Sequence, residues 1–177
     1  MAGLAVSDLA AFLLGNWRVE REVFDASRRG LTGAYSGTAA FTFDEHVAGL
    51  LRYVEHGTLR LGSHRGPAFR RLSFQVDGAC AQVAFDDGRY FHDLDLREGR
   101  WEVEHPCGDD RYSGRFDVDH AHRWRQQWTV NGPEKRQFIR TVLERPVTDP
   151  PAGRLAVNPE AGEWGLDWST ATRSGTA

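Results

Sequence analysis

Two histidines and a tyrosine are the side chains of this sequence best suited to acid–base chemistry. His92, His105 and Tyr112 lie in neighbouring segments of alternating polar and apolar residues. An imidazole changes charge near neutral pH, so it can give or take a proton under ordinary working conditions. A tyrosine hydroxyl can polarise a carbonyl group by donating a hydrogen bond. These three residues are the candidate catalytic groups.

A second set of residues could bind a ligand without reacting with it. Residues two apart in a strand share a face, and the more apolar face of each strand is expected to point inward. For Tyr53 and Glu55 the direction stays open, because residues 50, 52 and 54 of the opposite face are as apolar. The candidate ligand-binding residues are Arg21, Tyr53, Glu55, Tyr90, Gln126 and Trp128. Arginine and histidine among aromatic side chains suit a ligand with an apolar body and an anionic or carbonyl head group.

Strand parity also separates the polar residues around His92. Tyr90 and His92 share one face of their strand, whereas Asp93 and Asp95 lie on the other. All four therefore cannot line one cavity. We expect His92 and His105 to face the same interior.

A metal site is a weaker hypothesis. His105 and Cys107 place two ligand types close together, but a spacing of two is too tight for an ordinary paired-ligand motif, and a third ligand such as His92 would be needed. His120 and His122 are expected in an exposed turn, and no axial motif supports haem. The sequence contains no Gly-rich phosphate loop, nucleophile elbow or paired-thiol motif. We expect no metal and no cofactor.

The elements that must position these residues are almost all strands. Only the start is helical, from Ser7, which can cap the free N–H groups, to Leu14, with Gly15 ending the run. Turns rich in Gly, Asp, Asn and Pro then separate short segments of period two. The predicted strands cover residues 17–23, 34–43, 50–56, 58–62, 68–76, 79–86, 89–96, 100–105, 111–118, 123–130 and 136–145. This pattern predicts an all-β fold, an antiparallel up-and-down β-barrel with a short N-terminal helix, in which closure removes the sheet edges.

The chain divides into one domain and a tail. Residues 1–145 are the predicted barrel, and residues 146–177 hold four of the seven prolines. Such a composition cannot continue a sheet, so we expect a Pro-rich, partly disordered C-terminal tail. Trp164 and Trp168 lie four apart and could dock on the barrel. Docking of the tail stays an open alternative.

Length and charge restrict the classes of partner. The 177 residues are 40% hydrophobic, which suffices for a core in one domain. The net charge of -3 gives no broad basic field, so nucleic acid is not an expected partner. No stretch is long enough to span a membrane, and no secretion signal is seen, so we expect a cytoplasmic protein with Cys80 and Cys107 reduced. Nothing indicates the oligomeric state.

Two runs of residues carry a resemblance to a known family. Phe91-His-Asp-Leu-Asp-Leu96 and His105-Pro-Cys-Gly-Asp-Asp110 resemble an uncharacterised family of small bacterial proteins, the DUF6314-like group. The resemblance covers roughly residues 9 to 145. It implies a lipocalin-like (calycin) barrel and no established activity.

Gly15-Asn16-Trp17, after its helical start, also resembles the beginning of lipocalin-like barrels. That resemblance implies that Trp17 packs at the barrel floor beneath an arginine of the last strand, for which Arg140 is the candidate. A β-sandwich with a buried tryptophan is the alternative fold.

Three classes of function follow. The first is binding of a small, mostly apolar ligand with a polar or anionic head group inside the barrel. The second is a small enzyme, an isomerase, cyclase or hydrolase, that uses His92 or His105 as general acid or base on a metabolite in the barrel. The third is a protein-interaction module that uses the barrel rim and the tail.

Overall fold

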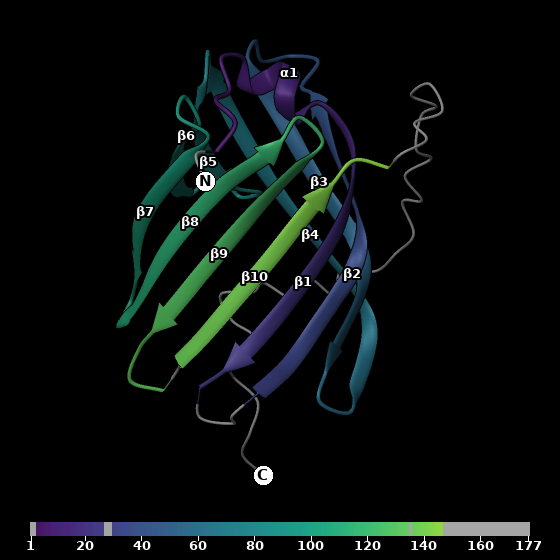
Figure 1. Ribbon diagram of the computed structural model, residues 1–177, viewed down its shortest axis with the longest axis vertical. Helices are drawn as coiled ribbons and strands as arrows, with labels where there is room; N and C mark the ends of the chain where they lie inside the picture. The colour runs from purple at the N-terminus through teal and green to yellow at the C-terminus, as the bar shows by residue number, and fades with distance from the viewer. Residues whose placement is uncertain (1–2, 27–29, 135, 147–177) are drawn as a thin grey trace.

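Ten antiparallel strands and one short helix form a nearly closed barrel in the computed structural model, which describes residues 3–26, 30–134 and 136–146 (Figure 1). The elements are α1 (Leu9–Leu13), β1 (Gly15–Asp25), β2 (Gly30–Phe43), β3 (Leu50–Leu61), β4 (His64–Asp77), β5 (Cys80–Phe85), β6 (Tyr90–Asp95), β7 (Arg100–Cys107), β8 (Asp110–His120), β9 (Arg123–Asn131) and β10 (Arg136–Glu144). The predicted all-β barrel with an N-terminal helix is confirmed. The predictions for Trp164, Trp168 and the rest of the tail lie outside the described residues. No helix in the described ranges is long and apolar enough to cross a bilayer.

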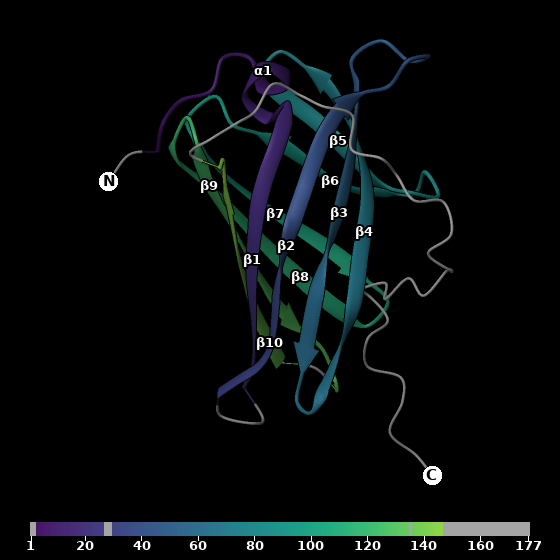
Figure 2. The ribbon, with the colours of Figure 1, turned by 90° about the vertical axis from the view of Figure 1, so that its right-hand side faces the viewer.

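The strand order shows how the barrel closes. Along the sheet the order is β6-β5-β4-β3-β2-β1-β10-β9-β8-β7, so the first and last strands of the chain pair with each other. β6 and β7 stand at the two ends of this order and contact each other across a line that we call the seam. Trp101 of β7 bridges the seam, because its Nε1 donates to the carbonyl of Asp93 on β6 at 2.9 Å. Figure 2 shows β1 to β4 on one side of the barrel and β7 and β8 behind them.

The two predicted strands over residues 50–56 and 58–62 are a single strand, β3. Gly57, which suggested a break, instead pairs with Gly37 of β2 in the middle of the ladder. The ring of Tyr35 lies over this glycine pair. A Cβ would lie 2.5 Å from the Tyr35 hydroxyl if added at Gly37, and 2.6 Å from its Cζ if added at Gly57. Both glycines therefore provide room for a buried tyrosine, not a turn.

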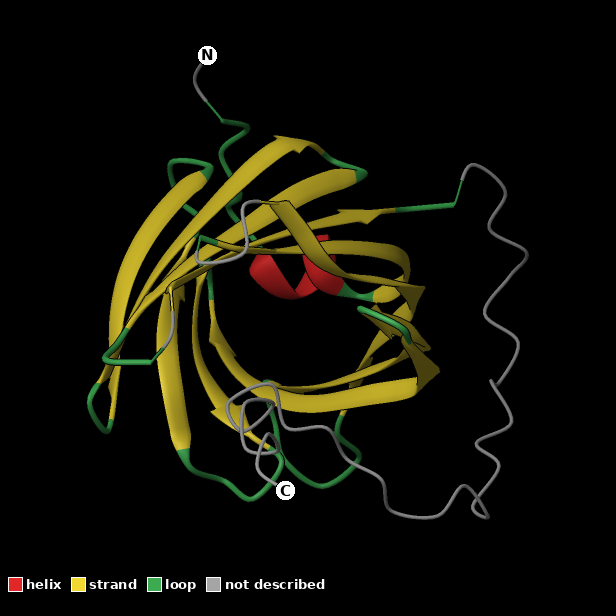
Figure 3. Ribbon diagram, turned by 90° about the horizontal axis from the view of Figure 1, so that it is seen from below, coloured by secondary structure: helices red, strands yellow, loops and turns green. Residues whose placement is uncertain are grey.

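Helix α1 closes one end of the barrel, as Figure 3 shows in the view along the strands. Its N-cap is Asp8 and not Ser7, because the Asp8 carboxylate accepts from the Ala11 N–H at 2.9 Å. Leu9 and Leu13 are fully buried in the core. Trp17 and Trp124 are fully buried at this end, where both rings pack against Phe12 of the helix.

Trp17 occupies the predicted floor position, but Arg140 does not cover it. Trp17 is fully buried and donates from Nε1 to the Leu13 carbonyl at 2.7 Å. The guanidinium over its ring belongs to Arg145, at 4.3 Å from the ring centroid. The Arg140 prediction is wrong because the β1–β10 register pairs Arg140 with Glu22, and both side chains point outward and form a surface ion pair. Arg145 follows the last strand and can reach back over the closed end.

Candidate functional site

The half of the barrel opposite α1 contains a cavity of about 620 Å³. This volume lies in the range of small-molecule sites. β5 pairs only with the second half of β4, from Leu72 to Asp77. The residues of β4 before Leu72 therefore lack this partner, and the cavity opens between them, the β5–β6 turn and the end of β7. The side chains around the cavity include Arg21, Phe69, Arg70, Phe85, Phe91, His105, Tyr112, Gln126, Trp128, Ile139 and Thr141.

A buried ion pair forms one wall of the cavity. Arg21 is 4% exposed and Glu55 1%. Arg21 donates from both terminal nitrogens to the two Glu55 oxygens at 2.7 and 2.9 Å, and from Nε to the Thr141 hydroxyl at 2.9 Å. The Tyr53 hydroxyl donates to Glu55 Oε2 at 2.5 Å. The sequence left open whether Tyr53 and Glu55 point inward or outward. Both point into the barrel, where they lie behind the part of the cavity surface that Arg21 forms.

The protonation states of this network follow from burial and charge. Burial alone would raise the pKa of Glu55, but the Arg21 guanidinium outweighs it and holds this pKa below its usual value. Burial raises the pKa of Tyr53 well above its usual value, and the Glu55 charge adds to the effect. At neutral pH the wall therefore contains an ionised glutamate, a charged arginine and a protonated tyrosine.

Arg70 is a cavity residue that the sequence analysis missed. It lies on β4 directly opposite Glu55 in the β3–β4 ladder and lines the cavity. Its guanidinium lies 5.6 Å from the centroid of the Phe91 ring. Strand parity contained the signal, because Arg70 alternates in step with the buried residues Ala68 and Leu72.

Aromatic side chains of β6 to β9 form the opposite wall. Phe91 and Trp128 stack with ring centroids 5.3 Å apart and an interplanar angle of 17°. His105 lies 5.2 Å from the Phe91 ring and 6.2 Å from the Tyr112 ring. Burial lowers the pKa of His105, and a hydrogen bond to the Phe91 backbone acts in the opposite direction. His105 and Tyr112 are thus neighbours on the cavity wall, while Gln126 lies on it as well.

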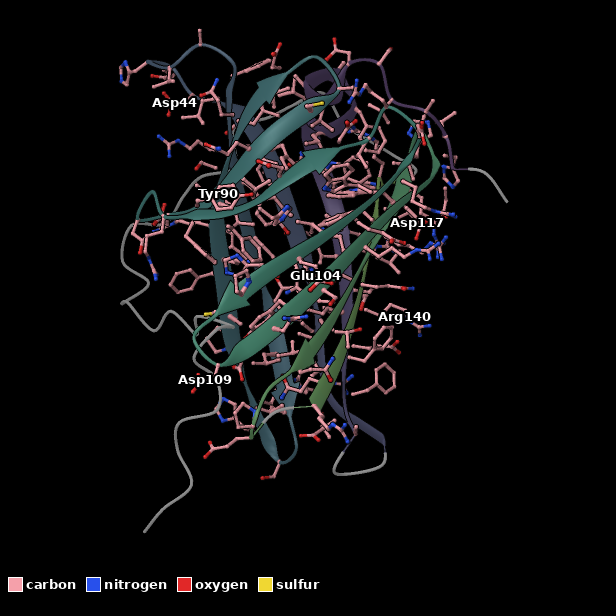
Figure 4. All side chains as sticks on the ribbon, turned by 90° about the vertical axis from the view of Figure 1, so that its left-hand side faces the viewer. Asp44, Tyr90, Glu104, Asp109, Asp117 and Arg140 are labelled. Carbon is pink, nitrogen blue, oxygen red and sulfur yellow. The ribbon has the colours of Figure 1, made fainter. Side chains whose placement is uncertain are left out.

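The expected common face of Tyr90 and His92 is wrong. A register shift between Val83 and Ala84 makes Phe91 an extra residue on β6, so Phe91 and His92 both turn inward. Tyr90 is left half exposed on the outer side of β6, where Figure 4 labels it, and it lies only at the cavity rim. A β-bulge of this kind breaks the parity rule on which the prediction depended.

His92 therefore does not share the cavity wall with His105. It is 4% exposed and packs among the rings of Phe91, Phe116 and Trp128. Its Nδ1 lies 2.8 Å from the carbonyl oxygen of Asp93. Burial lowers its pKa to about 4, so the imidazole is neutral at pH 7. The expectation that His92 and His105 line one cavity is therefore wrong, because Phe91 lies between His92 and the cavity.

His120, His122 and Cys80 do not line the cavity. His120 and His122 are exposed at the β8–β9 turn, as predicted. Cys80 and Cys107 are unbridged, and Cys107 lies at the cavity rim. Within the described part of the chain, no group of three His, Cys, Asp or Glu side chains is placed to hold a metal ion.

The fold and this cavity define a nearly closed antiparallel β-barrel with an internal cavity of small-molecule size. The chain belongs to the family of unknown function DUF6314, which matches residues 13–145. No curated protein matches the chain.

Two solved structures with a similar fold are distant in sequence. The S-type phycobiliprotein lyase CPES from Guillardia theta is 8% identical, with a TM-score of 0.58 over 82% of this chain and 95% of that protein. A protein of unknown function from the DUF3598 family of Nostoc punctiforme PCC 73102 is 15% identical, with a TM-score of 0.54 over 81% of this chain and 51% of the other. At these identities the likeness concerns the barrel fold alone.

Proposed function

We propose that the protein binds a small, mostly apolar molecule with a polar or anionic head group inside its barrel. The observation that carries this proposal is the buried Arg21–Glu55 pair at the wall of a cavity that aromatic side chains such as Phe91 and Trp128 also line. A buried ion pair is a weak source of stability, since apolar residues of similar volume often replace it without loss. Its position beside an open space of ligand size favours a role in recognition.

The similarity to a phycobiliprotein lyase supports the barrel architecture and not an activity. One fold hosts many functions, so the site must carry the argument. Here the aromatic wall would contact an apolar body, and the polar wall would orient a head group.

Native mass spectrometry of protein purified without refolding tests the proposal, together with binding of N-phenyl-1-naphthylamine, an apolar fluorescent probe. Gln126→Phe places a larger side chain on the cavity wall, whereas Gln127→Phe changes the adjacent residue, which does not line the cavity. We expect wild type and Gln127→Phe to retain a bound mass or to bind the probe, and Gln126→Phe to lose it. Equal binding by both variants, or none by wild type in either measurement, would refute the proposal.

A further inference from the structure

A row of polar side chains crosses three neighbouring strands at the cavity wall. Gln126 of β9 pairs with Thr141 of β10, and Thr141 pairs with Arg21 of β1. All three side chains line the cavity. β9, β10 and β1 lie side by side in the sheet (Figure 1). Directly opposite side chains of an antiparallel pair have their Cβ atoms about 5 Å apart, so one head group of a ligand can reach neighbouring members of this row.

Gln126 points inward at a position flanked by aromatic rings. It alternates in step with Trp124 and Trp128, which are both buried, and it pairs with the buried Phe116 of β8. Trp128 lines the cavity as well. A leucine or methionine of similar volume would pack in such surroundings, so packing alone does not require a glutamine here.

The carboxamide of Gln126 forms no hydrogen bond with any residue in the described ranges of the chain. A carboxamide carries two N–H donors and a carbonyl acceptor. Leaving such groups without partners costs free energy once they are removed from water. A ligand that fills the cavity therefore has to offer both an acceptor and a donor to Gln126.

The other two members of the row are bonded to each other. Arg21 donates from Nε to the Thr141 hydroxyl and from its terminal nitrogens to both oxygens of Glu55. Gln126 thus differs from its neighbours in the row, because its hydrogen-bonding groups face the cavity alone. A carboxylate offers only acceptors and would leave the Gln126 carbonyl unpaired. A primary or cyclic amide has its N–H and C=O on the same side and can form two hydrogen bonds with a carboxamide.

We infer that the head group of the ligand is an uncharged primary or cyclic amide, and that Gln126 binds it through two hydrogen bonds. The apolar body of the ligand then packs against the stacked rings of Phe91 and Trp128. This inference rests on the proposed function and names the chemical class of the head group.

Three probes that share one skeleton test the inference. 2-Naphthamide has a primary amide, 2-acetylnaphthalene has a methyl ketone of similar shape that keeps only the acceptor, and 2-naphthoate is an anion. We expect wild type to bind the amide about tenfold more tightly than the ketone, because the ketone leaves the Gln126 carbonyl unpaired. The amide should also bind more tightly than the anion. Isothermal titration calorimetry measures the three affinities.

Matched variants test the role of Gln126. Gln126→Leu removes the carboxamide at similar volume, and its preference for the amide over the ketone should fall below about twofold. Gln127→Leu makes the same change at the adjacent residue, which does not line the cavity, and should keep the preference of wild type. Gln126→Met is the second variant if Gln126→Leu does not melt cooperatively. A preference that persists in both Gln126 variants, or that is lost equally in Gln127→Leu, would overturn the role of Gln126.

The outcomes distinguish the inference from the proposed function. A wild-type protein that retains no bound mass and binds neither N-phenyl-1-naphthylamine nor any of the three probes would refute the proposed function. Binding of N-phenyl-1-naphthylamine without binding of the amide, or equal affinities for amide and ketone, would refute the amide head group alone. Tightest binding of 2-naphthoate would also refute it, in favour of an anionic head group, and would leave the proposed function intact.

Discussion

Lowering the pH from 7 to 5 should destabilise this barrel through His92. Burial lowers the pKa of His92 to about 4 in the folded protein, from an ordinary value of 6.5. Between these values the unfolded chain binds a proton that the folded chain does not, so the stabilisation is complete above pH 6.5 and is lost as the pH falls through 4. Through His92 the protein therefore loses about 2 kcal/mol of unfolding free energy by pH 5, and about 3 kcal/mol once the pH lies below both pKa values.

Urea denaturation at pH 7 and pH 5 measures this effect when wild type is compared with His92→Gln. The variant loses some stability at both pH values, but it lacks the titrating imidazole. We expect the drop in unfolding free energy between the two pH values to be about 2 kcal/mol larger in wild type. His105 and the carboxylates titrate in both proteins, so their contributions cancel. His120→Gln, at an exposed position, should behave as wild type. Equal drops in wild type and His92→Gln would show that His92 is not held neutral by burial.

Three further perturbations test the packing. Glu55→Gln leaves a buried arginine without its carboxylate, and urea denaturation should show a loss of about 3–5 kcal/mol. A loss under about 1 kcal/mol would contradict the burial of the pair. Trp17→Ala should lower the unfolding free energy by about 3–5 kcal/mol. Arg145→Met removes the cation over the Trp17 ring and should lower the melting temperature more than Arg140→Met does, because the surface ion pair of Arg140 is worth under about 1 kcal/mol. Equal effects of the two arginine changes would contradict the assignment of Arg145. A chain that ends at Thr148 should keep cooperative melting, because β10 is complete at Glu144; loss of the transition would show that later residues belong to the core.

Most of the barrel could be predicted from the sequence, because alternation and turn residues are local signals. The wrong predictions concern residues whose structure depends on contacts with residues far away in the sequence. Gly57 suggested a strand break, and only its partner Gly37 and the ring of Tyr35 show why a glycine lies inside a strand. Similarly, the arginine over Trp17 depends on the β1–β10 register, which no local pattern contains.

The candidate site could be predicted in part for the same reason. Parity assigned Arg21 and Tyr112 to the interior, where both line the cavity. Parity failed at Tyr90, since one bulge at Phe91 puts Tyr90 and His92 on opposite faces of β6. Arg70 was missed although it alternates in step with the buried residues Ala68 and Leu72. Its place beside Glu55 could not be known before the β3–β4 register was known.

The seam between β6 and β7 has a consequence for the speed of folding. Every ladder joins consecutive strands except that of β1 with β10, which pairs residues such as Glu22 and Arg140, 118 positions apart. A circular permutant cut in the β6–β7 turn, with the original ends joined, would have only consecutive pairings, and its new ends would lie at the seam. Because folding slows as contacting residues become more distant in sequence, this permutant should fold faster than the natural chain while keeping the same barrel.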